Sequence, residues 1–395
     1  MRIFHDAMLK ARELTLGGKL MEATLAIQQG LGLTQNKTDK SSSASASADA
    51  GQVVDMPHVS AAPDKQPFHT SAPADVEDVA FREFGVPQEP AGLSEPVDAP
   101  VSAPPLASSF SAGTFESGKH RYDYRVFVPS NPRPDLPVVV MLHGCKQDAR
   151  DFAAGTTMNA VAEREKFIVV YPEQLRQANS MGCWNWFDPA HQSRGEGEPA
   201  MIAALASHVA ALHRADPARI YIAGLSAGGA MAALAGKLYP EVFAAVGVHS
   251  GLAPGAARDV PSAFTAMRAG PGKSATVDAI GLPVIVFQGS ADKTVSPVNA
   301  SVIAREEVAA WARHGLQLSP THATAPSSGG RDSSIVRWTD PAGKAYVEIW
   351  TIQSAPHAWA GGDLAGSFTD PKGPGASEAM FRFFARHSNT RLPRK

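Results

Sequence analysis

The sequence predicts the α/β fold class, with a mostly parallel central sheet and helices on both faces. Short apolar runs rich in β-branched residues recur along the chain, and residues 137–142 are a clear example. Patterns with helical spacing lie between these runs. Strands that alternate with helices form a parallel sheet whose crossover helices cover both faces. The 395 residues are enough for one large domain with extensions.

The composition excludes several classes of protein. Hydrophobic residues make up 44% of the chain and charged residues 19%, as is usual for a globular protein. The formal net charge of −2 argues against a nucleic-acid partner. No apolar run reaches the roughly 18 residues that a membrane span needs. Asp6 and Lys10 interrupt any apolar core of a secretory signal, so a cytoplasmic location is the default expectation.

Two segments of different character precede the predicted domain. Apolar side chains of residues 3–33 fall at helical spacing around a Gly-Gly break, which predicts a helical hairpin over residues 1–33. Such a hairpin cannot bury its apolar face alone, so we expect it to dock on its own domain, to self-associate or to contact a hydrophobic surface. Residues 34–112 are rich in Ser, Ala, Pro and acidic residues, which predicts a disordered linker before the domain of residues 113–390.

Three strands and two helices are predicted in the first part of the domain. Residues 122–128 are rich in Tyr, Phe and Val, which favour strands. Residues 137–142 and 167–171 are apolar runs typical of strands that are buried on both faces. Residues 159–166 and 198–213 have helical spacing, and the second of these helices is long.

The second part of the domain continues the alternation. Residues 219–223 predict a strand, which leads into the alanine-rich helix of residues 227–238. Residues 243–248 and 283–288 predict two further buried strands. The remaining predicted elements are a helix over residues 297–313, strands over residues 335–339 and 346–352, and a closing helix over residues 378–385. Ligands of such sheets gather at the carboxyl ends of the strands.

A Gly-x-Ser-x-Gly pattern lies between a predicted strand and a predicted helix, at residues 224–228. This context is that of a nucleophile elbow, a sharp turn that presents Ser226 at the end of the sheet. Gly224 and Gly228 fit the turn because a Cβ at either position would collide with neighbouring backbone. The alternative is a glycine-rich turn with a chance serine, but the flanking strand and helix favour the nucleophile.

A serine nucleophile needs a general base, and the base needs an orienting partner. With this elbow the chain order is Ser, then Asp or Glu, then His. Asp292 follows the strand of residues 283–288 and so lies at the same end of the sheet as the elbow; the alternative is a helix-capping or turn aspartate. His357 follows the strand of residues 346–352; the alternative is a capping or surface histidine. The sequence therefore predicts a triad of Ser226, Asp292 and His357.

The reaction of such a triad also needs two backbone N–H donors for the oxyanion. One should come from Ala227, the residue after the nucleophile, at the positive end of its helix. The other should come from the His143-Gly144-Cys145 turn that follows residues 137–142. We favour the N–H of Cys145 as this second donor, and the alternative is an ordinary tight turn.

Five further side chains are candidates for contact with a substrate. Aromatic residues in a glycine-rich loop can line a pocket, and they can equally form a local core under a long loop. The candidates are Trp184, Asn185, Trp186, Trp359, which adjoins His357, and His249, which follows a predicted strand.

The chain has two cysteines, Cys145 and Cys183. Two cysteines do not make a disulfide framework, so they form either one bridge or two buried thiols. Neither the cysteines nor the histidines fall at metal-ligand spacing, and we therefore expect no metal site. A serine mechanism also needs no cofactor.

Six motifs, in order along the chain, resemble those of the polyhydroxybutyrate depolymerase family of esterases, relatives of feruloyl and acetylxylan esterases. The motifs are LHGCKQ at residues 142–147, CWNWF at 183–187, RGEGE at 194–198, GLSAGG at 224–229, QGSAD at 288–292 and PHAW at 356–359. The resemblance spans about residues 115–388. It implies an α/β-hydrolase fold, the triad given above and hydrolysis of carboxylic esters through an acyl-enzyme.

The resemblance carries further implications. It implies a disulfide between Cys145 and Cys183, next to the oxyanion turn, and many of the relatives are extracellular. The expected substrates are poly- or oligo-hydroxyalkanoates or short-chain esters. The alternatives are a feruloyl or acetyl carbohydrate esterase, a serine peptidase on the same fold, and a granule- or surface-binding protein that adheres through residues 3–33.

Overall fold

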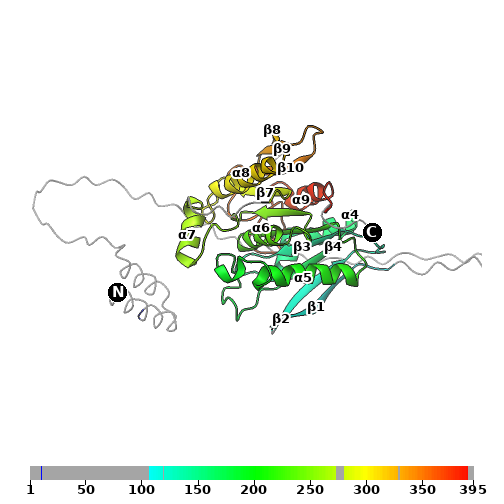
Figure 1. The fold of residues 1–395 in the computed structure, drawn as a ribbon. Coiled ribbons are helices and arrows are strands. Elements are labelled where there is room, and N and C mark those ends of the chain that lie inside the picture. The colour runs from blue at the N-terminus through cyan, green and yellow to red at the C-terminus, as the bar shows by residue number, and fades with distance from the viewer. Residues whose placement is uncertain (1–9, 11–105, 119, 273–279, 328–329, 390–395) are drawn as a thin grey trace, which may run out of the picture. The chain divides into compact units, whose positions relative to one another are not determined.

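Strands and helices alternate along residues 109–384 in the computed structural model (Figure 1). The residues described are 10, 106–118, 120–272, 280–327 and 330–389. Apart from Lys10, the predicted hairpin of residues 1–33 lies outside them, as does the predicted linker up to residue 105. Strand β1 (Ser109–Ser117) begins before residue 113, the expected start of the domain, and so includes the last residues of the predicted linker.

A ten-stranded sheet forms the centre of the described domain, in the order β1-β2-β4-β3-β5-β6-β7-β10-β9-β8. Besides β1, its strands are β2 (His120–Val128), β3 (Val138–Leu142), β4 (Ile168–Pro172), β5 (Ile220–Leu225), β6 (Ala245–His249), β7 (Val284–Gly289), β8 (Ser319–Ala325), β9 (Ser333–Thr339) and β10 (Ala345–Ile352). The six strands from β4 to β10 are parallel, and the pairs at both edges are antiparallel. The prediction of a mostly parallel sheet is confirmed.

Helices cover both faces of the sheet (Figure 1). One face packs against α5 (Gly197–Leu212), α6 (Ala227–Leu238), α7 (Val260–Ala269) and α8 (Val298–Arg313). The other face packs against α3 (Ala149–Thr156), α4 (Met158–Glu165) and α9 (Ala376–Phe384). A 3-10 turn η1 (Pro189–His191) and a short parallel pair, β11 (Trp359–Ala360) with β12 (Thr369–Asp370), complete the elements.

Burial on both faces explains why the sequences of the interior strands are continuous apolar runs. In β3, Val138 and Val140 pack into the core on one face, while Val139 and Met141 pack into the core on the other. All four side chains are fully buried. A strand covered on both faces has no solvent-exposed position for a polar residue, so the alternation of an open sheet is absent.

Several elements of the structure differ from the sequence-based expectation. Strands β1 and β8 lie at the two edges of the sheet, and most of their residues are exposed. Edge strands with exposed faces carry no hydrophobic pattern, and in this chain they resemble polar linker. Helices α3 and α7 are also absent from the prediction, although Asp148 and Asp259 cap their N-termini with side-chain hydrogen bonds. Among the described residues, no helix has the length and apolar content to cross a bilayer.

Candidate active site

Ser226 occupies a strained turn between β5 and α6. Its backbone has φ 58° and ψ −120°, a combination that non-glycine residues adopt only where the surrounding structure holds them. Its N–H donates to the carbonyl of His249 at the end of the neighbouring strand β6, at 2.9 Å. The hydroxyl-bearing residue is half-buried at the carboxyl end of the sheet.

The glycines of the elbow allow a very close approach between α6 and the end of β3. A Cβ on Gly228 would lie 2.2 Å from the carbonyl oxygen of Leu142, and one on Gly224 would lie 2.4 Å from the backbone of Gly228. A Cβ on Gly144 would lie 3.7 Å from the Cβ of Ser226. The turn that follows β3 is therefore directly beside the serine.

Asp292 and His357 are joined by a short hydrogen bond. Nδ1 of His357 lies 2.7 Å from Oδ2 of Asp292. The carboxylate side chain is fully buried, whereas that of His357 is 12% exposed. The other carboxylate oxygen accepts the N–H groups of Thr294 and Val295, each at 2.9 Å. The pair thus has a buried, fixed carboxylate and an imidazole that solvent reaches.

The electrostatics of this pair favour an ionised aspartate. Burial works to raise the pKa of Asp292, but the hydrogen bond and charge of His357 and the two backbone N–H groups outweigh it, and the pKa is lowered. The carboxylate is therefore charged at neutral pH. It can hold the imidazole in one orientation and stabilise the positive charge that the ring gains on protonation.

The structure brings Ser226 and the Asp292–His357 pair to one end of the sheet, because β5, β6 and β7 are adjacent parallel strands. Among the described residues, no hydrogen bond joins the Ser226 hydroxyl to His357. Catalytic hydrogen bonds are often long in ligand-free enzymes and shorten only with substrate bound.

The two backbone N–H groups expected to hold the oxyanion have no hydrogen-bond acceptor among the described residues. In the part of the chain that the structure describes, neither the N–H of Cys145 nor that of Ala227 donates to a protein oxygen. Ala227 is the first residue of α6, where N–H groups have no partner within the helix. Cys145 follows Gly144, which lies against Ser226. Both donors therefore lie in segments that adjoin Ser226.

The turn that contains Cys145 is held by hydrogen bonds to the loop that carries Gln174 and Trp184. The ring of His143 is buried and accepts the N–H of Gln174 at Nε2, 3.2 Å away. Burial lowers the pKa of His143, so the ring is neutral and its Nδ1–H donates to the carbonyl of Gly144 at 2.9 Å. The indole N–H of Trp184 donates to the carbonyl of His143 at 3.1 Å.

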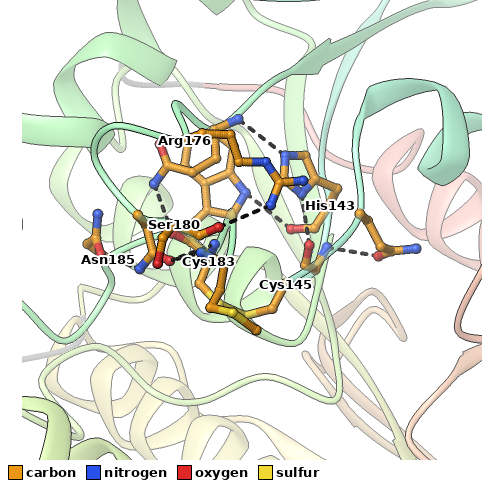
Figure 2. The surroundings of a disulfide bond; sticks show 12 residues. His143, Cys145, Arg176, Ser180, Cys183 and Asn185 are labelled. Carbon is orange, nitrogen blue, oxygen red and sulfur yellow. Dashed lines mark hydrogen bonds between the residues drawn. A yellow bond between two sulfur atoms is a disulfide. The ribbon is translucent and has the colours of Figure 1, made fainter. Parts of the chain in front are cut away.

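A disulfide joins this turn to the same loop. The sulfurs of Cys145 and Cys183 are 2.10 Å apart, and the two residues are 38 positions apart in the chain. Figure 2 shows the bond between the segment that holds His143 and the loop that leads to Asn185. The loop is held in turn by the backbone hydrogen bond from Lys146 to Met181, at 2.9 Å.

The side chains expected to contact a substrate are mostly buried supports. Trp184, Trp359 and His249 are at most 1% exposed, and Trp186 is 6% exposed. His249 accepts the N–H of Ala360 at Nε2 (3.0 Å) and stacks against two other rings. These four residues lie in the core and not on an open pocket wall. Trp184 and Trp186 belong to the core cluster that includes the buried side of α5, whereas His249 ends β6 and Trp359 begins β11. Asn185 is half-buried.

Glu198 is a functional candidate to which the sequence reasoning assigns no role. It is 3% exposed, and its carboxylate accepts both the backbone and the side-chain N–H of Asn185, each at 2.7 Å, and the amide of Gln174 at 2.6 Å. Burial raises its pKa, against the opposing effects of His191 and these hydrogen bonds. The carboxylate holds the loop that carries Trp184. Its signal in the sequence is the RGEGE motif, which gives no indication of what the carboxylate binds.

Among the described residues, no cluster of His, Cys, Asp and Glu side chains has the arrangement of a metal site.

Comparisons with known proteins agree with the motifs. The model of the esterase PHB depolymerase family matches residues 122–311. Poly(3-hydroxyalkanoate) depolymerase C of Paucimonas lemoignei is 34% identical over 245 residues, which cover 58% of this chain and 56% of the relative. Feruloyl esterase B of Thermothelomyces thermophilus is 32% identical over 165 residues, which cover 41% of this chain and 56% of the relative. The chain spans about half the length of these curated relatives.

Among solved structures, an acetyl xylan esterase from Aspergillus awamori superposes with a TM-score of 0.53. The match covers 70% of this chain and 99% of that structure, at 18% sequence identity. At this identity the likeness concerns the fold alone. The α/β-hydrolase fold and the resemblance to the depolymerase esterases, both predicted from the motifs, are confirmed.

Proposed function

We propose that this chain, whose residues 122–311 match the esterase PHB depolymerase family, is a serine hydrolase of carboxylic esters. Ser226 is the nucleophile, His357 the general base and Asp292 its orienting partner. The observation that carries the proposal is the 2.7 Å Asp292–His357 pair at the same end of the sheet as the strained turn of Ser226. An imidazole that is partly open to solvent and bonded to a buried carboxylate is the arrangement that such chemistry needs.

The first step is attack of the Ser226 hydroxyl oxygen on the ester carbonyl carbon. Nε2 of His357 accepts the hydroxyl proton, while Nδ1–H donates to Asp292. The resulting imidazolium is stabilised by the aspartate, whose lowered pKa keeps it ionised. The imidazolium then gives its proton to the leaving alcohol, and an acyl-enzyme remains on Ser226.

In the second step water takes the place of Ser226 as the nucleophile, and His357 again acts as the base. His357 takes a proton from water, which attacks the acyl carbon; the imidazolium then returns the proton to the departing Ser226 oxygen, and the acid is released. In both steps the N–H groups of Ala227 and Cys145 hold the oxyanion, and each such donor contributes about 3 kcal/mol to transition-state stabilisation. The unpartnered state of both N–H groups supports this role.

The substrates are proposed from the names of the relatives. Hydroxyalkanoate oligomers or polymers, or short-chain esters, are the first candidates because a poly(3-hydroxyalkanoate) depolymerase is among the relatives. Feruloyl and acetyl esters of carbohydrates are the alternative, since feruloyl and acetylxylan esterases are relatives too. Rates on hydroxybutyrate oligomers, feruloyl esters, acetylated xylan and an aminoacyl anilide, measured side by side, would separate these classes and a peptidase.

The test of the chemistry is the variant Ser226→Ala. We expect it to lose hydrolysis of p-nitrophenyl butyrate and to keep the wild-type unfolding temperature. Ser207→Ala is the matched control, because its hydroxyl donates only within α5, to the carbonyl of Ala203. Turnover in Ser226→Ala equal to that of the control would refute the proposal.

A binding role for residues 3–33 is a separate proposal. Their apolar spacing supports self-association or contact with a polyester granule. Cosedimentation of the full chain with granules, compared with a chain that lacks residues 1–33, tests it. Equal sedimentation of the two chains would contradict granule contact, and an equal number of chains per particle in light scattering would contradict self-association.

A further inference from the structure

Gln147, the last residue of the LHGCKQ motif, has no part in the chemistry above, yet its amide is the centre of a buried network. The residue is 3% exposed. Its Oε1 accepts the N–H of Gly144 at 2.9 Å, and its Nε2 donates to Oδ2 of Asp151 at 2.8 Å and to the carbonyl of Ser367 at 3.0 Å. Both ends of the amide are thus used, and its orientation is fixed by the partners.

This network engages both polar groups of Gly144, the residue before Cys145. The N–H of Gly144 is occupied by Gln147 and is not available to a substrate. The carbonyl of Gly144 accepts Nδ1–H of His143 and the N–H of Gln147 (3.3 Å). The carbonyl of Gly144 and the N–H of Cys145 belong to the same peptide group. In a planar trans peptide the C=O and N–H point in opposite directions, so the two hydrogen bonds that hold this carbonyl also fix the direction of the Cys145 N–H.

The support of Gln147 extends to the chain segment after the catalytic base. Asp151, in α3, accepts the backbone N–H of Ser367 at 2.8 Å and its hydroxyl at 2.6 Å. Ser367 lies between β11 and β12, ten positions after His357. Asp151 and Gln147 therefore connect the oxyanion turn to the segment that follows the base.

We propose that Gln147 is a positioning residue, held by Asp151 and Ser367, which aims the N–H of Cys145 at the oxyanion. The inference rests on the proposed esterase function and adds to it a residue that touches no substrate atom. An oriented donor stabilises the transition state more than the ground state, so its loss reduces kcat and leaves KM unchanged. A residue that only fills the core would change stability and leave kcat per folded molecule unchanged.

The test is a cycle of three variants that exchange donor and acceptor. In Gln147→Glu two carboxylates face each other, and in Asp151→Asn two amide donors can face each other. In the double variant the amide introduced at position 151 donates to the new carboxylate, whose other oxygen still accepts the N–H of Gly144. We expect each single variant to lose roughly tenfold or more in kcat, which is less than the roughly 10²–10³ of removing a donor itself. The double variant should recover part of the loss.

The measurements are kcat and KM for p-nitrophenyl butyrate, with the unfolding temperature of each variant as the check of folding. Unchanged kcat in a folded Gln147→Glu variant, a rise in KM with kcat preserved, or a double variant no better than the worse single variant would each overturn the assignment. Wild-type and Ser226→Ala samples run in parallel identify the other failure. If both hydrolyse the ester equally, the proposed function falls, and the role of Gln147 falls with it.

Discussion

At the scale of single residues, the candidate site depends on two histidines in opposite environments. His357 is 12% exposed and hydrogen-bonds to a buried carboxylate, so the proposed base is open to solvent on one side. His249 is fully buried between Phe287 and Trp359 and accepts the N–H of Ala360. Its ring is a fixed neutral acceptor, which orders the segment that follows His357.

Asp292→Asn should show how much the orientation of His357 contributes to kcat. The asparagine amide can present a donor to Nδ1 and thereby stabilise the wrong tautomer of the ring, so we expect kcat at neutral pH to fall by roughly 10⁴-fold. The measurement is hydrolysis of p-nitrophenyl butyrate at pH 7.5. Asp340→Asn, in the turn between β9 and β10, is the control. Equal activities of the two variants would contradict the role of Asp292.

His249→Gln should reduce the loss of stability on acidification. Burial, with the nearby charge of His357, lowers the pKa of His249 to about 3. Between this value and the ordinary pKa of about 6.5, the unfolded chain binds a proton that the folded chain does not, so stability falls as the pH falls. For this group the loss of unfolding free energy between pH 7 and pH 5 is about 2 kcal/mol.

Urea unfolding at pH 7 and pH 5 measures this difference. We expect a smaller decrease in His249→Gln than in the wild type, and not its disappearance, because the pKa values of His143 and His387 are also lowered by burial. His322→Gln, at an exposed position of β8, serves as the control. The same decrease in wild type and His249→Gln would contradict a neutral buried ring.

At the scale of elements, the site is a junction of strand ends. The elbow of β5 and α6 contacts the turn after β3 so closely that glycine is required. The Asp292 loop follows β7, and the His357 segment follows β10, its parallel neighbour. The Ser226 turn, the Asp292 loop and the His357 segment therefore lie at the same end of the sheet, because their strands are parallel members of one sheet.

Gly228→Ala should damage this junction. The new Cβ would lie 2.2 Å from the carbonyl oxygen of Leu142 and 2.5 Å from that of His143, and backbone atoms cannot move aside as a flexible side chain can. We expect a loss of about 1–3 kcal/mol of unfolding free energy and a fall in activity through displacement of Ala227. Gly272→Ala is the control, since its Cβ would meet nothing within 4 Å. Wild-type stability and activity of Gly228→Ala would contradict the described contact.

The elements also show how far the sequence could be interpreted. Interior strands such as β3 and β7 are predictable within one or two residues because burial on both faces leaves a continuous apolar run. The edge strands β1 and β8 are not, because exposure removes that pattern. Chain order and strand position indicate the residues that meet at the site. The burial of Trp184 and His249 could not be predicted, since an aromatic side chain in a loop or at the end of a strand has the same sequence signature in a core and in a pocket.

At the scale of the whole molecule, one covalent bond connects segments that the sheet does not hold. The Cys145–Cys183 disulfide closes a loop of 38 residues, which includes α3, α4 and β4. A cross-link of this kind limits the conformations of the unfolded chain and so stabilises the folded one. It also fastens the oxyanion turn to the loop that Glu198 holds.

The variant Cys145→Ala/Cys183→Ala should be less stable by about 2–4 kcal/mol, as expected for a loop of this length. It keeps the backbone N–H of residue 145, so any fall in kcat per folded molecule reports the position of that donor. Urea unfolding and ester hydrolysis are the measurements. Treatment of the wild type with a reductant should reproduce both effects, and it should not change the variant. Equal stability of variant and wild type would contradict the stabilising role.

The same bond has a practical consequence for the handling of the protein. If the proposed donor is correct, the thiol additives common in purification buffers act on catalytic geometry and not only on shelf life. Batches that differ in sulfhydryl content would then differ in turnover for every ester tested, and rankings of substrates across batches would be misleading. Titration of free sulfhydryls should therefore precede each kinetic comparison.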